Sequence, residues 1–277
     1  MIKEKLANKI TAYIIVYNDI AKIEAAINSV LWADEVLVVD SHSTDGTTEL
    51  AQKLGAKVVH VEFKGFGDLR NKALSHCKHE WIFSLDSDER CTKELRDEIL
   101  QILNKDINES EHDIYFVPRK NYFMGKLIKH SGWYPNYRQP QLFKKGAMSY
   151  TMDPVHEGYI NNSKDKKIGY LKNHVWQKPF EDFNQFMHKS NRYSDLGSCK
   201  LENKNIRPSL GNALYKASWA FFKHYFLKKG MLDGWPGFLI AFGYFEVTFY
   251  KYSKLFEKAK IKENKWREPE SKPLYRN

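Results

Sequence analysis

The chain has 277 residues and a formal net charge of +10, and 42% of its residues are apolar and 14% aromatic. This composition excludes an intrinsically disordered chain, and the length allows one large α/β domain with appendages or two small domains. Residues 1–110 hold 14 Lys and Arg against 19 Asp and Glu, whereas residues 111–277 hold 30 against 15. The basic second half favours an anionic partner: nucleic acid, anionic lipid or a phosphorylated substrate.

The first hundred residues predict strands that alternate with helices. Short apolar runs indicate buried strands, at Thr11–Tyr17, Val36–Val39, Lys57–Val61 and Trp81–Leu85. Apolar residues at helical spacing indicate helices at Ala21–Leu31, from Thr48 to Leu54, at Asp68–Cys77, and from Thr92 to Leu103. We expect Asp45 and Thr92 to cap the second and fourth helices. Repeated βα units predict a mainly parallel sheet flanked by helices, with ligands bound where the strands end.

The pattern changes after about residue 111. Asp113–Val117 predicts one more strand, Tyr122–Gly158 has the aromatic, Gly and Pro content of long binding loops, and Gln177–Leu201 predicts a helix. Beyond these, aromatic runs alternate with lysines. We therefore expect residues 1–110 and 111–200 to be the two halves of one α/β domain, and residues 201–277 to be a helical extension.

Cysteine usage and hydropathy indicate the compartment. Cys77, Cys91 and Cys199 lack the spacing of metal ligands, which fits a reducing environment. The first apolar run ends at Asn18 and is too short for a signal peptide, and no stretch reaches the roughly 18 uninterrupted apolar residues of a membrane span. We therefore expect a cytoplasmic protein.

Two carboxylates one residue apart follow the fourth predicted strand, in Asp86-Ser87-Asp88-Glu89. Such hard oxygen ligands suit Mg²⁺ or Mn²⁺, which takes its remaining ligands from a substrate diphosphate. A solvated acidic turn before the next helix would have the same sequence. The neighbouring strand ends therefore decide between the two interpretations.

Polar residues at these strand ends favour a nucleotide site. The Asp40 carboxylate follows the second strand, where it can accept hydrogen bonds from a base or ribose. Arg70 can hold a phosphate or a carboxylate by a two-pronged contact, and the alternative for this side chain is a surface salt bridge.

Four blocks, in this order and spacing, resemble the family 2 glycosyltransferases, which have the GT-A fold. They are Ile14–Asn18, Val39–Thr47, Arg70–Leu74 and Asp86–Glu89. The resemblance implies that Asp88 binds the metal ion, Mg²⁺ or Mn²⁺, and that Asp86 faces the ribose or the metal. It implies a nucleotide-sugar site formed by Tyr17, Asn18, Asp40, Ser43, Asp45, Arg70, Asp86 and Arg138. Ser41 stands where many members have a second Asp, so contacts near the base are expected to differ.

The second half resembles a narrower branch, the lipopolysaccharide core β-1,4-glucosyltransferases. The shared pieces are Arg138–Phe143, Val155–Gly158 and His174. The resemblance implies a metal-dependent hexosyltransferase that takes a sugar from a nucleotide donor, expected to be UDP-glucose. Direct displacement with one base would invert the anomeric centre, so an inverting enzyme is expected. The implied acceptor is a lipopolysaccharide-core or other lipid-linked saccharide. Another cell-surface polysaccharide or a polyprenyl-linked acceptor is the alternative.

The acceptor hydroxyl must lose its proton, for which a carboxylate opposite the leaving group is the natural base. Glu157 is the first candidate because it matches the branch motif, and Asp153 is the second. His156 and His174 are candidate metal ligands or diphosphate contacts, with a structural role as the alternative for each.

The basic aromatic extension predicts binding to an anionic membrane surface. Lysines among Trp and Phe residues fit a helix that lies in the interface, so the protein is expected to be peripheral on the inner face of the cytoplasmic membrane. A pair of core helices with a basic solvated face is the alternative. A nucleic-acid-binding protein is disfavoured because the best motifs lie in the acidic half, so no nucleic-acid partner is expected. A nucleotidyltransferase is disfavoured because no Gly-rich loop follows the first strand.

Overall fold

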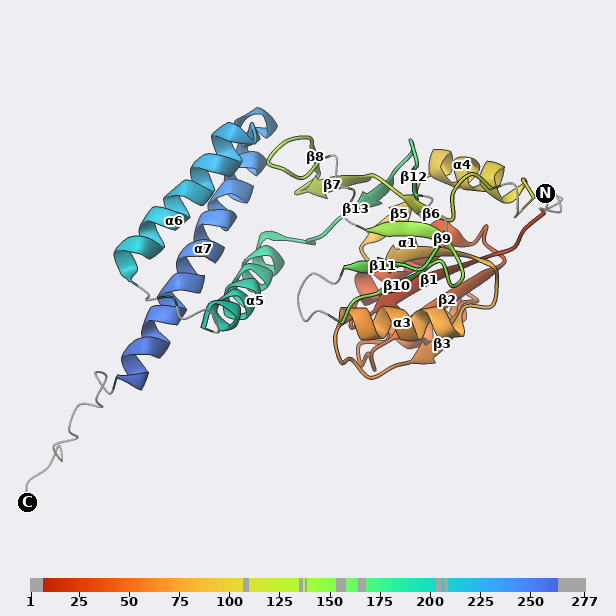
Figure 1. The fold of residues 1–277 in the computed structure, drawn as a ribbon, viewed down its shortest axis with the longest axis horizontal. Helices are drawn as coiled ribbons and strands as arrows, with labels where there is room; N and C mark the ends of the chain where they lie inside the picture. Colours follow the sequence, from red (N-terminus) through yellow and green to blue (C-terminus); the bar gives the residue numbers. More distant parts are fainter. Residues whose placement is uncertain are drawn as a thin grey trace, which may run out of the picture. The chain divides into compact units, whose positions relative to one another are not determined.

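The protein is described from a computed structural model, which covers residues 7–106, 110–134, 137, 139–152, 158–163, 168–202, 206 and 209–263. The chain forms two compact units, labelled by their elements in Figure 1. Unit 1 comprises Met1–Lys129 with Trp133–Pro179, and unit 2 comprises His130–Gly132 with Phe180–Asn277. The domain boundary predicted near residue 200 thus falls inside the last helical turns of a unit 2 helix, α5 (Phe183–Glu202).

A seven-stranded sheet, in the order β12-β6-β9-β4-β1-β2-β3, is the centre of unit 1. Its strands are β1 Ile10–Val16, β2 Glu35–Asp40, β3 Lys57–His60, β4 Trp81–Asp86, β6 Ile114–Phe116, β9 Pro140–Lys144 and β12 Ile168–Tyr170. Strand β1 is parallel to β2 and β4, and β2 is parallel to β3. Strand β9 runs antiparallel to β4 and to β6. The mainly parallel sheet confirms the predicted α/β fold class.

Helices cover both faces of this sheet, with α1 Ile20–Val30, α2 Thr47–Lys53 and α4 Lys93–Leu103 on one face and α3 Phe66–His76 on the other. Figure 1 labels α1, α3 and α4. Because successive strand residues face opposite sides, Ile14 packs into the core formed with α1, α2 and α4, whereas Ile15 packs into the core formed with α3. The Thr92 hydroxyl accepts the Leu95 N–H at 3.2 Å and caps α4, as predicted.

Two smaller antiparallel or mixed sheets complete unit 1. One has the order β5-β13-β7-β8, and the other pairs β10 with β11. Their strands are β5 Glu89–Cys91, β7 Arg119–Phe123, β8 Lys126–Ile128, β10 Met148–Tyr150, β11 Tyr159–Asn161 and β13 Val175–Gln177. The helix predicted from Gln177 was wrong at its start, because β13 pairs with both β5 and β7 and the helix begins only at Phe183.

Unit 2 is helical. It contains α5, α6 Leu210–Phe222, the π-helical turn η1 Lys223–Leu227, the 3-10 turn η2 Gly230–Asp233, and α7 Trp235–Lys262. Helix α7 packs against α5 and α6. Its first turn accommodates Pro236, where the missing N–H costs no helical hydrogen bond. Among the described residues, no helix combines the length and the apolar character that a bilayer crossing needs.

Candidate active site

The predicted site residues Asp40 and Asp86 lie at one edge of the main sheet because parallel strands end there together. In the strand register, Ile15 of β1 pairs with Asp86 of β4, and Val16 pairs with Asp40 of β2. The loops that follow these strands therefore share one end of the sheet, which is where open α/β sheets bind ligands.

The loops after β1 and β2 are tied to each other by Asn18. Its N–H donates to the Ser43 hydroxyl at 2.8 Å, and its side-chain oxygen accepts the Thr44 N–H at 2.8 Å. Asn18 has a positive φ of 47°, which Asn tolerates better than most residues. Tyr17 beside it is 63% exposed, so its ring faces solvent at this edge.

Asp40 organises the β2–α2 loop. The carboxylate is fully buried and accepts the Ser43 N–H at 3.0 Å and the Thr48 hydroxyl at 2.9 Å, and it pairs with His60 at 3.2 Å. It also accepts a short hydrogen bond from the Ser43 hydroxyl. These contacts give Asp40 and Ser43 a loop-shaping role at the predicted nucleotide site.

Asp45 links two helices, and the prediction that it is the N-cap of α2 was wrong. The N-cap is Gly46, which has a φ of 92°. The Asp45 carboxylate accepts the Thr47 N–H at 3.1 Å and the Ile20 N–H at 3.0 Å, so it joins the first residues of α2 and α1. Burial raises the Asp45 pKa, but these hydrogen bonds outweigh it and leave the pKa below its usual value.

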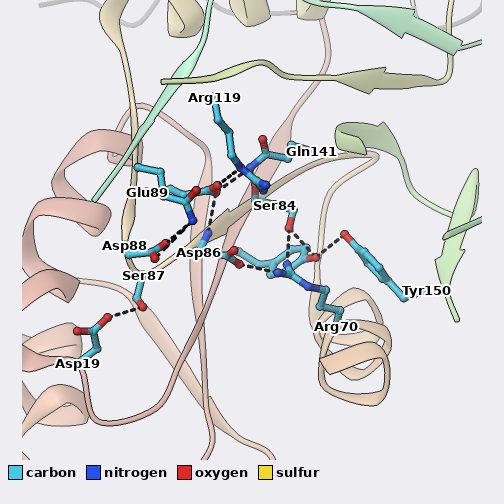
Figure 2. Close-up of polar contacts among 12 residues, drawn as sticks. Asp19, Arg70, Ser84, Asp86, Ser87, Asp88, Glu89, Arg119, Gln141 and Tyr150 are labelled. Carbon is cyan, nitrogen blue, oxygen red and sulfur yellow. Dashed lines mark hydrogen bonds and ion pairs between the residues drawn. The ribbon is translucent and has the colours of Figure 1, made fainter. Parts of the chain in front are cut away.

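Arg70 of α3 holds a carboxylate of this chain (Figure 2). One terminal nitrogen donates to Asp86 Oδ1 at 2.6 Å and the other to the Ser84 hydroxyl at 3.1 Å. The Arg70 side chain is only 6% exposed, so the alternative of a surface salt bridge was wrong. Arg70 therefore holds the Asp86 carboxylate in place, and its predicted contact with the nucleotide stays a prediction.

A chain of hydroxyls continues from Arg70 to β10. The Ser84 hydroxyl donates to the Tyr13 hydroxyl at 2.8 Å, which lies 3.0 Å from the Tyr150 hydroxyl. Burial raises the Tyr13 pKa well above its usual value, so this phenol stays protonated. Sequence reasoning missed Tyr13, Ser84 and Tyr150, because their hydroxyls lie on buried strands that otherwise read as core.

Asn71 and Gly67 of α3 also contact the end of β10. Asn71 accepts the Tyr150 N–H at 2.8 Å and donates to the Tyr150 carbonyl at 2.9 Å. A Cβ on Gly67 would lie 1.9 Å from the Thr151 carbonyl oxygen, so only glycine allows this approach. The neighbouring residues Arg70 and Asn71 therefore hold Asp86 and Tyr150 in place, respectively.

A buried ion pair supports the turn Asp86-Ser87-Asp88, which we call the DxD turn. The fully buried Glu89 carboxylate pairs with Arg119 of β7 and accepts Gln141 Nε2 of β9 at 2.8 Å (Figure 2). It also accepts the Asp86 N–H at 3.1 Å. Burial, against the opposing effect of Arg119, raises the Glu89 pKa to about 7, and the charge of Asp86 adds to the rise. Sequence reasoning assigned no role to these residues, although Arg119 in an otherwise alternating buried strand was a usable signal.

Asp88 lies on the same turn as Asp86, held at its backbone. Its carbonyl accepts the Lys178 N–H at 2.9 Å, and Gln177 Nε2 lies 3.2 Å from its carboxylate. The Ser87 hydroxyl between the two aspartates donates to Asp19 at 2.6 Å, which ties the turn to the start of α1. Within the described ranges, no group of three or more His, Cys, Asp and Glu side chains is placed to hold a metal ion.

The predicted site residue His174 stands apart from this turn. His174 precedes β13, where its carbonyl accepts the Thr92 hydroxyl at 3.0 Å, whereas the Asp88 carboxylate meets Gln177 at the other end of that strand. Three strand residues span roughly 10 Å, so the structure does not bring His174 to the two aspartates. Burial lowers its pKa, with a further contribution from Lys120. The other predicted site residues lie outside the described residues: Arg138, Asp153, His156 and Glu157.

Comparisons with known proteins identify the family. The family model described as Glycosyl transferase family 2 matches residues 11–205. An uncharacterized glycosyltransferase of Rickettsia bellii is 33% identical over 92% of this chain and 88% of its own length. The lipopolysaccharide core biosynthesis glycosyltransferase LpsC of Rhizobium meliloti is 26% identical over 91% of this chain and 94% of its own. The crystal structure of S. aureus TarS in complex with UDP-GlcNAc covers 92% of both chains with a TM-score of 0.47 and 16% identity. The chain belongs to glycosyl transferase family 2.

Proposed function

We propose that this glycosyltransferase moves a hexose, glucose, from a UDP-sugar to a lipid-linked or lipopolysaccharide-core saccharide, with inversion and with Mg²⁺ or Mn²⁺. The observation that carries the proposal is the placement of Asp86 and Asp88 at the sheet edge shared by the loops after β1 and β2. The acceptor class follows from the likeness to LpsC, which extends over most of both chains.

The donor set fits a metal ion that is shared with the substrate. Two carboxylates supply hard oxygen ligands, and Mg²⁺ typically takes one or two carboxylates together with substrate phosphates and water. Such an ion, when bound, neutralises the charge that develops on the departing nucleoside diphosphate. Arg70 contributes by holding Asp86 at 2.6 Å, so this carboxylate keeps one orientation.

The transfer forms a bond from the acceptor oxygen to the anomeric carbon and breaks the bond to the diphosphate. The acceptor proton goes to a carboxylate, for which Glu157 is the first candidate and Asp153 the second. Both follow Tyr150 and Thr151 closely in the chain, and α3 holds that segment through Asn71 and Gly67. A single displacement from the face opposite the leaving group inverts the anomeric centre.

Calorimetric titration of UDP with Mn²⁺ tests the donor site. We expect Asp88→Asn to abolish metal-dependent binding and Asp86→Asn to weaken it. The matched control is Asp97→Asn, on an aspartate that is 49% exposed and forms an ion pair with its neighbour Arg96, and it should bind as the wild type does. Unchanged titration curves for Asp88→Asn would remove the DxD turn from the donor site.

The base assignment is tested by turnover with UDP-glucose. Glu157→Gln should retain UDP affinity and lose roughly a hundredfold or more in kcat. Normal turnover in Glu157→Gln together with loss in Asp153→Asn would move the role to Asp153. Product formation on a polyprenyl-linked saccharide but not on a lipopolysaccharide core would favour the alternative acceptor.

A further inference from the structure

Aromatic side chains of α6, η1 and α7 form one continuous exposed surface. Ring contacts connect Trp219 to Phe222 at 5.7 Å, Phe222 to Phe226 at 5.1 Å, and Phe238 to Phe242 at 6.2 Å. Tyr225 joins the two helices, with ring centroids 5.0 Å from Phe226 and 5.9 Å from Phe238. We call Trp219, Phe222, Phe226, Phe238 and Phe242 the aromatic face; each is between 41% and 53% exposed.

The turn between the helices exposes further apolar side chains. Leu227, Met231, Leu232 and Trp235 are between 47% and 60% exposed. Other contacts fix the conformation of this turn. A Cβ on Gly237 would lie 1.9 Å from the Gly230 carbonyl oxygen, and the buried Asp233 accepts the His130 N–H at 3.0 Å. A turn fixed by glycine contact and a buried carboxylate therefore presents its apolar side chains to a partner.

The charges around this surface have one sign. The two acidic residues between 209 and 251, Asp233 and Glu246, are only 4% and 8% exposed. The exposed charged residues of the same stretch are all lysines, at Lys216, Lys223, Lys228 and Lys229. An apolar aromatic surface that is bordered by lysines and has no exposed acid complements a partner with an apolar interior beneath an anionic surface layer.

We propose that the aromatic face and the turn of unit 2 dock into the interface of an anionic lipid bilayer. Leu232 and Trp235 enter the boundary between headgroups and acyl chains, where the indole ring is favoured, and the lysines contact anionic headgroups. The inference deepens the proposed function, on which it rests for the lipid-linked acceptor, by naming the surface that meets the acceptor's membrane. The contacts that carry it are independent of the sugar chemistry.

Sedimentation of the full chain with vesicles tests the proposal without donor or acceptor, so a wrong transferase assignment would leave the result interpretable. The chain should bind vesicles made of equal parts phosphatidylcholine and phosphatidylglycerol, and not phosphatidylcholine alone. The triple variant Lys223→Gln, Lys228→Gln, Lys229→Gln should lose about fivefold in affinity per lysine. The matched control replaces the exposed unit 1 lysines Lys53, Lys64 and Lys78 by Gln and should bind as the wild type does.

High salt weakens the electrostatic part of vesicle binding and so reveals the contribution of the apolar side chains. The double variant Leu232→Gln, Trp235→Gln should release from the vesicles completely at high salt, whereas the wild type should retain part of its binding. The control Phe63→Gln, at a unit 1 ring that is 45% exposed, should retain it equally. Equal binding by both triple lysine variants, or a dimer in solution that Trp219→Gln and Phe222→Gln convert to a monomer, would overturn the proposal, because the surface would then serve another partner or a second copy of the chain.

Discussion

Replacing Arg70 should destabilise the protein even when no ligand is present. The substitution Arg70→Met removes a charge-assisted hydrogen bond of 2.6 Å to Asp86 and a second bond of 3.1 Å to Ser84. A hydrogen bond to a charged group contributes about 1.5 to 3 kcal/mol and a neutral one about 1 kcal/mol. Since Met fills part of the space, we expect a loss of about 3 kcal/mol.

Thermal denaturation monitored by circular dichroism measures this loss. For a domain of this size, 1 kcal/mol shifts the melting temperature by about 2 to 4 °C, so Arg70→Met should melt roughly 6 to 12 °C below the wild type. Arg70→Lys retains the charge but cannot bridge both partners, and it should lose less. Arg96→Met is the matched control, since this arginine is 32% exposed and its ion pair with Asp97 should contribute less than about 1 kcal/mol.

A double-mutant cycle tests whether the loss of stability in Arg70→Met comes from its contact with Asp86. If Arg70 acts through Asp86, the double variant Arg70→Met, Asp86→Asn should be more stable than the sum of the two single losses predicts. The reasoning is refuted if ligand-free Arg70→Met melts with the wild type and only its UDP affinity falls, because Arg70 would then contact the diphosphate directly.

Three further perturbations follow from close packing, a buried ion pair and a buried imidazole. Gly67→Ala should cost about 1 to 3 kcal/mol by thermal melting, because its Cβ meets the Thr151 carbonyl oxygen; Gly211→Ala, on a helix with open space, should be neutral or stabilising. Arg119→Met should cost about 3 to 5 kcal/mol by leaving Glu89 buried without this partner, and the added change Glu89→Gln should recover part of the loss. Burial lowers the His224 pKa, so the unfolded chain takes up a proton that the folded chain resists, and stability should fall as the pH drops below about 6.5. His224→Gln should therefore reduce the difference in melting temperature between neutral and mildly acidic buffer, and an unchanged difference would exclude His224 as its source.

The first half of the fold was predictable because its signals are local. Buried strands of four to seven residues and amphipathic helices each carry their own periodicity, as β1 and α4 illustrate. The second half was not, because strands such as β12 and β13 have only three residues. Their existence depends on partners distant in sequence, and the pairing of β13 with β5 and β7 overrides the local helical tendency near Gln177.

The position of the candidate site residues at the strand ends was predictable, and their contacts were not. Parallel strands bring Asp40 and Asp86 to one edge whatever their roles, so the position alone found them. The partner of Arg70 was ambiguous because a guanidinium suits a phosphate and a carboxylate equally well. The structure shows Arg70, only 6% exposed, paired with the chain's own Asp86, and its contact with a phosphate stays a prediction.

The DxD turn is braced by two buried arginines from different parts of the chain. Arg70 of α3 holds the Asp86 carboxylate, and Arg119 of β7 pairs with Glu89, which accepts the Asp86 N–H. Gln141 on β9, the antiparallel strand next to β4, donates to the same Glu89 and to the Ser84 carbonyl. Fixing Asp86, which is proposed to hold the metal ion, from both its side chain and its backbone would reduce the reorganisation that binding requires. The charges that look redundant beside a metal motif are therefore what holds Asp86 in place, and Arg119 and Gln141 should be as sensitive to substitution as the aspartates themselves.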